Sequence, residues 1–262
     1  SCAKEKENLV EVIEQNEIDF QMIKAYEEGM EALEQQDGFT AAKKFSEAEL
    51  LFPQSNWAPR AALMAAYSYF TVDYYSDTIY EVERFLKTYP EHPRTDYAYY
   101  LLAITYYDKV VDETRDLEAI LKSKEYFEIL IKDYPETDYA MDSKFKLEVI
   151  YEVMASKEMY LARYYLDKEK WIPAINRFKI VVENYNDSIF IEEALHRLVE
   201  IHYYIGLEKE AKKYAKILGY NYNSSEWFKQ SYKILNRDYK LVKKKKSAES
   251  KNLFKKIIDK IR

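Results

Sequence analysis

Small, aromatic and helix-breaking residues follow one another along the chain at spacings that fit pairs of packed helices. Gly29 and Ala41 are small enough to let two helices cross closely. Phe45 and Ala48 would fill the space between neighbouring pairs, and Pro53 would end the second helix of the first pair. Strand-like alternation of apolar and polar residues is almost missing. The pattern therefore predicts an all-α chain that begins with a helix pair.

The step that would end a helix recurs downstream. It appears as Phe52-Pro53, Tyr89-Pro90, Tyr134-Pro135 and, in weaker form, Tyr185-Asn186. These offsets match the tetratricopeptide (TPR) repeat, whose unit is roughly 34 residues long, although each interval here is longer. We therefore expect a right-handed TPR solenoid of five helix pairs with one long shared helix and an extra C-terminal helix.

The two longest intervals between these helix-ending steps, 90–135 and 135–186, predict two departures from the regular repeat. A polar stretch from Asp108 to Asp116 suggests a long loop in the third unit. No glycine or proline lies between Pro135 and Pro173, so residues 138–167 should form one continuous helix about 45 Å long. Such a helix would join the units on either side of it rigidly.

The expected organisation divides the chain into five segments. They are a leader (1–18), TPR units one to three (19–135), units four and five with the long helix (136–223), a capping helix (224–246) and a basic amphipathic tail helix (247–262). Ser225 is suited to cap the first of the two C-terminal helices. The apolar stripe of this capping helix is expected to consist of Trp227, Phe228, Tyr232 and Leu235.

The composition agrees with a helical array and offers no catalytic chemistry. The chain has four glycines and 27 tyrosines, and most of the tyrosine rings should pack between helices. A minority, such as those between Tyr97 and Tyr107, could instead line a peptide-binding surface. The histidines His92, His196 and His202 include no pair at metal-ligand spacing. Four isolated glycines cannot form a phosphate loop, so we expect no metal, no cofactor and no catalytic residues.

Charge is distributed unevenly along the chain. Residues 1–50 carry 13 acidic and 5 basic side chains, whereas residues 207–262 carry 6 acidic and 17 basic ones. The segment from residue 251 to residue 261 would place its apolar residues on one face of a basic helix. It could lie on an anionic membrane, dock on a partner or fold back on the solenoid. Without interleaved aromatic residues, it does not predict nucleic-acid binding.

The single cysteine, Cys2, excludes a disulfide framework. It follows one small residue and precedes a polar stretch, which resembles the cut end of a bacterial lipoprotein signal. Lipidation of Cys2 would tether the array to a membrane. The alternative is a free surface thiol.

Two further runs carry a resemblance to a known family. They are Tyr89-Pro90-Glu91-His92-Pro93 followed by Asp96-Tyr97 and Tyr100, and Tyr164-Tyr165 followed by Trp171, Ala174 and Asn176-Arg177. Over about residues 20–235 the chain resembles the BamD family, lipoproteins of the outer-membrane β-barrel assembly machinery. The resemblance implies a non-enzymatic scaffold, acylated at Cys2 and held on the periplasmic face of the outer membrane.

The resemblance also implies partners and the residues that meet them. The C-terminal units would bind a periplasmic domain of BamA, and the N-terminal units would bind unfolded outer-membrane β-barrel precursors; other lipoproteins of the machinery would be further partners. The implied BamA-binding residues are Arg177, Asn176, Lys168 and Tyr165, and the implied client-peptide residues are Phe52, Tyr67, Tyr97 and Tyr100.

Some of these assignments leave alternatives open. Arg177 could form a salt bridge to an acidic residue of the long helix instead of meeting a partner. Lys168 stands where the family often has arginine, and Trp171 is expected to be a packing residue. Two other functions also remain open, a periplasmic TPR adaptor that coordinates cell-wall and envelope processes, and an α-superhelical enzyme that cleaves the cell wall.

Overall fold

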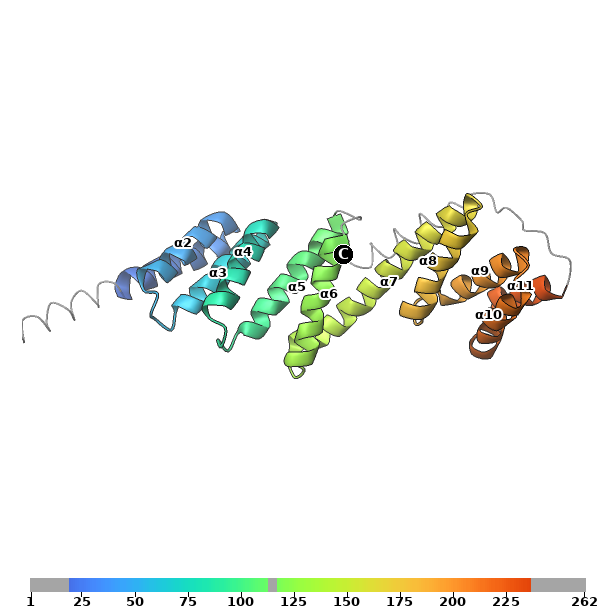
Figure 1. Cartoon of the computed structure of the whole chain (residues 1–262). Coiled ribbons are helices and arrows are strands. Elements are labelled where there is room, and N and C mark those ends of the chain that lie inside the picture. Colours follow the sequence, from blue (N-terminus) through green and yellow to red (C-terminus); the bar gives the residue numbers. More distant parts are fainter. Residues whose placement is uncertain (1–18, 113–116, 237–262) are drawn as a thin grey trace, which may run out of the picture. The chain divides into compact units, whose positions relative to one another are not determined.

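The computed structural model describes residues 19–112 and 117–236 of the chain. The predicted leader, its lipidation site Cys2 and the basic tail helix lie outside the described residues. Every regular element within the described residues is an α-helix, as predicted (Figure 1).

Within the described residues, the helices follow one another as five pairs and a last single helix. The pairs are residues 19–34 with α2 (Gly38–Leu51), α3 (Ala58–Thr71) with α4 (Tyr75–Thr88), α5 (Thr95–Asp112) with α6 (Leu117–Asp133), α7 (Asp138–Asp167) with α8 (Trp171–Asn184), and α9 (Ile191–Tyr204) with α10 (Glu208–Asn221); α11 (Glu226–Leu235) comes last. This succession confirms the predicted helical repeat, and α7 has the predicted bounds. The handedness of the solenoid stays a prediction.

The described residues form two compact units that divide after Lys146, within α7. Unit 1 comprises described residues up to Lys146, and unit 2 comprises residues 147–236. The first part of α7 packs in unit 1, where Tyr139 contacts two tyrosines of α5. The later part of α7 packs in unit 2, where Ala155, Met159 and Ala162 belong to the core formed with α8 and α9.

The second helix of every pair buries two residues at the same spacing. A small residue comes first, and it is fully buried in each case: Ala41, Thr78, Ser123, Ala174 and Ala211. Seven residues later stands another buried residue, in order Ala48, Phe85, Leu130, Val181 and Leu218. Because the small residue lets the two helices approach closely, this pattern is the physical basis of the repeat.

Two glycines of unit 1 stand where helices approach each other closely. A methyl group added at Gly38 would lie 2.5 Å from the backbone oxygen of Ser68 on α3, and one at Gly29 would lie 2.9 Å from the ring of Phe45. These contacts confirm that Gly29 is small because two helices cross there. They also explain why a pair of short helices can share a core made largely of alanine.

Two sequence-based expectations about helix bounds and faces are wrong. The predicted loop from Asp108 is helical as far as Asp112, because no glycine or proline interrupts it and Tyr107 packs against Phe127. In α11 the fully buried residues are Ser231 and Ile234, whereas Tyr232, assigned to the apolar stripe, is 62% exposed. The predicted cap itself is confirmed, since the Ser225 hydroxyl accepts a hydrogen bond from the Phe228 backbone N–H at 3.0 Å.

Candidate binding surfaces

A row of exposed and half-buried side chains follows the outer side of α2, away from the buried residues of that helix. We call Phe39, Lys43, Ser46 and Leu50, together with Tyr69 of α3 and Tyr74, the α2 surface. At 100° per residue the four α2 side chains fall within about 60° of one another. Leu50 is 78% exposed.

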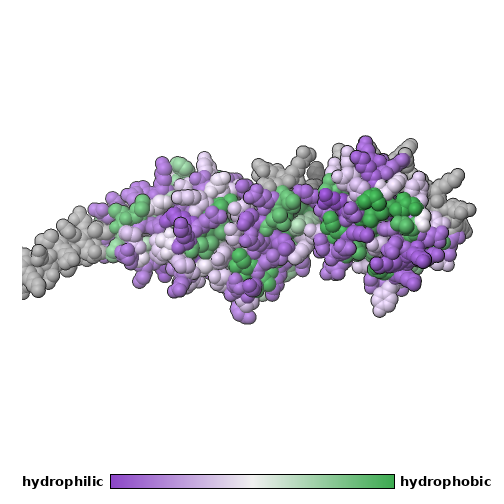
Figure 2. All heavy atoms as spheres, in the orientation of Figure 1, coloured by the Kyte–Doolittle hydropathy of each residue, from purple (hydrophilic) through white to green (hydrophobic). Residues whose placement is uncertain are grey.

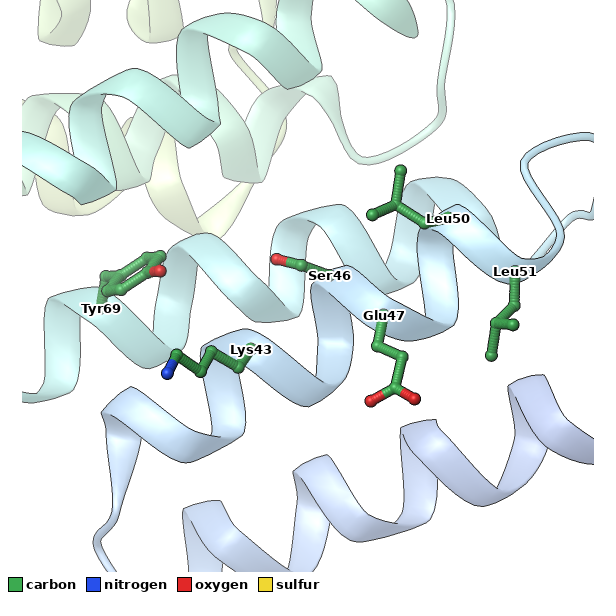
Figure 3. Close-up of a pocket in the computed structure, with 6 residues that line it drawn as sticks. All are labelled: Lys43, Ser46, Glu47, Leu50, Leu51 and Tyr69. Carbon is green, nitrogen blue, oxygen red and sulfur yellow. The ribbon is translucent and has the colours of Figure 1, made fainter.

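The α2 surface contains an open pocket of about 410 Å³. The pocket is lined by Lys43, Ser46, Glu47, Leu50, Leu51 and Tyr69. Figure 3 shows that five of these side chains come from one stretch of α2, and that Tyr69 comes from the neighbouring helix. The lining combines apolar side chains with one cation and one anion, a mixture suited to a peptide.

Aromatic rings close one end of the α2 surface. The rings of Phe39, Tyr69 and Tyr74 lie 5.9 to 6.5 Å apart, and the Lys43 ammonium lies 4.9 Å from the centre of the Phe39 ring. Burial, with the nearby carboxylates Asp77 and Glu81, raises the pKa of Tyr69, so its hydroxyl stays protonated. The surface therefore offers an uncharged aromatic end, a cation in the middle and an exposed leucine at the other end.

The predicted client-peptide residues lie elsewhere in unit 1. Tyr67 and Tyr97 pack against the core formed by α3, α4 and α5. Tyr100 stacks on Tyr139 with ring centres 4.8 Å apart. The Tyr100 hydroxyl donates a hydrogen bond to Asp142 at 2.8 Å, and burial together with this bond raises the pKa of Tyr100. The structure thus brings these tyrosines together as packing contacts between helices.

Phe52, the fourth predicted client residue, is separate from these tyrosines. It is half-buried at the end of α2 and packs against Met22, Ala25 and Ala48. Sequence reasoning missed the α2 surface because it followed the buried repeat positions. The signal that could have revealed it is an apolar residue, Phe39 or Leu50, recurring on the face that should be polar.

In unit 2, Arg177 has an intramolecular partner. Its guanidinium donates to both carboxylate oxygens of Glu158 on α7, at 3.0 and 3.2 Å. This is the salt bridge to the long helix that the sequence left open. The Arg177 side chain is still 37% exposed, so part of the guanidinium faces solvent.

The other predicted partner residues lie on either side of Arg177. Tyr165 packs against the core of unit 2, and Lys168 is exposed in the turn between α7 and α8. Asn176 is exposed on α8, one turn after the exposed Ile172. Because residues 172 and 176 are four apart, they share the outer face of α8, whereas Arg177 is turned toward α7. We call Lys168, Ile172, Asn176 and Arg177 the α8 surface.

Trp171 is a packing residue, as expected. It is half-buried against the core of unit 2, and its ring lies 5.0 Å from that of Tyr204. Next to it Ile172 is exposed, as are Tyr204 and Leu207 at the turn between α9 and α10. Figure 2 shows patches of hydrophobic residues among hydrophilic ones on one face of the molecule.

The histidines and acidic residues form no metal site within the part of the chain that the structure describes. The His196 ring shares a hydrogen bond with the Ser231 hydroxyl, and the His202 ring donates a hydrogen bond to the backbone oxygen of Leu198. Both histidines are buried, on different sides of α9. None of the helices described here is both long and apolar enough to cross a membrane.

Comparison with known proteins places the chain in one family. The profile of the YfiO family, described as "outer membrane lipoprotein", matches residues 18–218. The "outer membrane protein assembly factor BamD" of Caulobacter vibrioides is 36% identical over 211 residues, which cover 80% of this chain and 69% of that protein. The protein of the same name from Rickettsia prowazekii is 38% identical over 210 residues, covering 80% and 84%.

A more distant relative extends the match. The BamD protein of Neisseria meningitidis serogroup B is 26% identical over 225 residues, which cover 82% of this chain and 84% of that protein. The family is one of non-enzymatic assembly factors of the outer membrane. The resemblance predicted from the tyrosine-proline and Asn176-Arg177 runs is thereby confirmed. The chain belongs to the BamD (YfiO) family of outer-membrane lipoproteins.

Proposed function

We propose that this protein is a scaffold in outer-membrane protein assembly, which binds unfolded β-barrel precursors through unit 1 and a periplasmic domain of BamA through unit 2. The family membership supports the general role. The observation that carries the client-binding part is the α2 surface, with its pocket and its exposed leucine. Both interactions need only a preformed surface, and no chemical step is involved.

The spacing along α2 suits an extended peptide. Four residues of a helix advance about 6 Å, and two residues of a strand advance about 6.6 Å. Every second side chain of a bound strand would therefore meet the next turn of α2. Strands of a membrane barrel carry apolar side chains at every second position. Between Phe39 and Leu50, about 16 Å apart along the axis, roughly five residues of such a strand would fit.

A peptide-binding assay tests the client site. A fluorescent peptide with the sequence of the C-terminal strand of an outer-membrane barrel protein is titrated with the full chain, and anisotropy is measured. Leu50→Ser should weaken binding about tenfold, because the apolar contact is lost. Leu121→Ser, at an exposed leucine of α6, is the matched control and should change nothing. Equal affinities of all three proteins would contradict the proposal.

The tyrosines first implied by the resemblance remain candidates for the same role. Tyr100→Phe removes only the hydroxyl that donates to Asp142. If the peptide lay on these tyrosines, this change would weaken binding while Leu50→Ser would not. Our proposal predicts the reverse: Leu50→Ser should weaken peptide binding and Tyr100→Phe should not.

For the partner of unit 2, we propose that the α8 surface binds BamA and that Arg177 exchanges Glu158 for an acceptor on the partner. A guanidinium that is partly exposed can donate paired hydrogen bonds to a second carboxylate or to backbone oxygens. Lys168 and Asn176 would add contacts, with Tyr165 supporting the turn from within. The bound state would then leave Glu158 without its present partner.

A pair of variants separates partner contact from internal support. Arg177→Glu should strongly reduce recovery of a purified periplasmic domain of BamA. Glu158→Gln frees Arg177 from its internal salt bridge and should leave recovery unchanged or improve it. If Arg177 only supports the fold, both variants will lose binding alike, and the proposed contact is wrong. Circular dichroism establishes that both variants stay helical.

The lipid attachment predicted at Cys2 is part of the same proposal. Cys2→Ser would remove the acyl group and release the protein from the outer membrane, because lipidation is then the main source of membrane affinity. Fractionation of cells that produce the variant measures this. Retention of the variant in the outer-membrane fraction at high salt would contradict the proposed anchor.

A further inference from the structure

The outer face of α10 carries a row of lysines that ends in a tyrosine. Lys209, Lys213, Lys216 and Tyr220 are all exposed, and at 100° per residue they fall within about 60° of one another. The buried residues of the helix, Ala211, Tyr214 and Leu218, lie on the opposite side. We call these four exposed residues the α10 stripe. It extends about 16 Å along the helix axis.

The lysines of the α10 stripe have no acidic partner within the described residues. Among the described residues, the one salt bridge of α10 joins Lys212 to Glu208, both of them largely exposed, and lies beside the stripe. Glu208 and Glu210, the acidic residues of α10, both belong to its first turn and project to the two sides. Beyond that turn, the stripe presents positive charge alone.

Tyr220 adds an amphipathic ring to this charge. It is 90% exposed, more than any other large apolar or aromatic side chain of the described residues. A ring with a polar tip is typical of residues at a membrane–water interface. On the following helix Tyr232 is also exposed, and so is Lys233.

We propose that the α10 stripe binds the anionic phospholipid surface of the membrane to which this lipoprotein is attached. Lysine is a hydrated point charge that suits a fluid array of phosphates better than a fixed acceptor pair. The stripe has no groove and a single aromatic residue, whereas a protein interface needs a central buried cluster. The family places the protein at a membrane. The inference does not depend on the client or BamA sites.

The charge of the chain after α11 has the same sign. Residues 237–262 contain eleven basic and three acidic side chains. A negative lipid surface would therefore attract this end of the sequence as a whole. The same charges could also account for binding without the α10 stripe, so the experiment must separate the two.

Vesicle binding of the full chain with Cys2→Ser, which carries no acyl group, tests the proposal. Vesicles of phosphatidylethanolamine with phosphatidylglycerol are compared with vesicles of phosphatidylcholine alone by co-sedimentation. We expect binding to the anionic vesicles, reduced by high salt because the charges are screened. The triple variant Lys209→Gln, Lys213→Gln and Lys216→Gln should bind at least tenfold more weakly, given about fivefold for each lysine near the surface.

The matched control removes the same charge from unit 1. Lys87→Gln, Lys132→Gln and Lys144→Gln alter three exposed lysines and should leave vesicle binding within twofold of the parent. Tyr220→Ser should weaken binding by about threefold and should do so at high salt as well, because ring insertion is not screened.

Several results would overturn the proposal. The first is equal binding of the parent and the α10 triple variant, which would assign the interaction to the residues after α11. The second is an equal loss in both triple variants, which would reduce the effect to net charge. The third is a parent that binds no anionic vesicles but retains an acidic protein, with the α10 triple variant losing it; the stripe would then be a protein-binding surface.

Discussion

Unit 1 and unit 2 use the same helix pair but fill the space between helices differently. The first helix of the second pair, α3, buries five alanines, at positions 58, 61, 62, 65 and 66. The corresponding helix of the last pair, α9, buries Leu195, Leu198, Val199 and Ile201 instead. The packing around α3 therefore depends on close approach of backbones, whereas the packing around α9 depends on burial of larger side chains.

The two units also differ in their buried charges. In unit 1 a buried carboxylate, that of Glu49, accepts two hydrogen bonds from Arg84 and one from Tyr89. Burial and the nearby Glu49 raise the pKa of Tyr89 to about 12, so this phenol donates at neutral pH. The arrangement ties α2 to the end of α4.

In unit 2 the central group is a cation. Arg197 lies between Glu193 and Glu200, and its guanidinium stands 5.6 Å from the centre of the Trp227 ring on α11. His196 bonds to Ser231 of the same helix at 2.8 Å. These contacts help to hold α11, whose Trp227, Phe228 and Leu235 also pack against the core of unit 2. Unit 1 should be sensitive to added volume, and unit 2 to the loss of charge.

The largest expected effect is that of Arg197→Ala. It leaves Glu200, which is almost fully buried, without a counter-charge, and loss of one partner from a buried pair costs about 3 to 5 kcal/mol. Arg84→Ala in unit 1 should cost less, about 2 kcal/mol, because Arg84 is a third exposed and water can replace it in part. Urea unfolding gives both free energies. A larger loss in unit 1 would contradict the comparison.

Added side-chain volume, in contrast, should destabilise unit 1 more than unit 2. Gly38→Ala places a methyl group against a backbone oxygen that cannot move alone, and we expect a cost of about 2 kcal/mol. In unit 2, a methyl group added at Gly219 meets only the Phe228 ring, at 2.7 Å. That ring can shift and alanine favours the helix by about 1 kcal/mol, so Gly219→Ala should be close to neutral.

Hydrogen exchange locates these effects. The faster exchange caused by Gly38→Ala should be confined to α2 and α3, because contacts in a repeat array are made mainly between neighbours. If Gly219→Ala destabilised the protein as much as Gly38→Ala, the distinction between a backbone contact and a side-chain contact would be wrong.

Mild acid should weaken unit 2 through Glu193. Burial alone would raise the pKa of this carboxyl, but the hydrogen bonds and charges of Arg163 and Arg197 outweigh burial and lower it below 4.5. A folded-state pKa below the unfolded value stabilises the protein above pH 4.5, and this stability is lost as the pH falls further. Hydrogen exchange of α9 should therefore accelerate from pH 5 to about pH 3.5 after correction for intrinsic rates.

The matched variant for this prediction is Glu193→Gln. It should be less stable than the parent at neutral pH and should show a smaller further loss in acid, since the titrating group is gone. An unchanged acid response in the variant would assign the loss to other carboxylates.

The sequence predicted most of the fold because the repeat depends on local residue size. Ala41, Ala174 and Ala211 could be placed at helix crossings from spacing alone, and the missing breakers before Pro173 predicted α7. The predicted loop at Asp108 was wrong at its start, because a polar stretch without glycine or proline can continue a helix.

The candidate sites were less predictable because they depend on residues far apart in the chain. Arg177 was chosen for a partner, but its salt bridge joins it to Glu158, nineteen positions earlier. Tyr100 was chosen for a peptide, and its hydroxyl bonds to Asp142. The α2 surface appears only when Tyr69 is placed beside Lys43. No local pattern specifies such contacts, so sequence alone could name residue types but not their neighbours.

A smaller loss of stability is expected from a change at the last helix of unit 2. Ser225→Ala removes the hydroxyl that caps α11 and should cost about 1 kcal/mol, because the Phe228 N–H loses its acceptor. Ser224→Ala changes the exposed neighbouring serine and is the control. If the His196–Ser231 hydrogen bond and the contact of Arg197 with the Trp227 ring hold α11 in place, hydrogen exchange should accelerate only in the first turn of α11. Acceleration along the whole of α11 and into α9 would instead mean that the cap, and not those side-chain bonds, keeps the final helix in place.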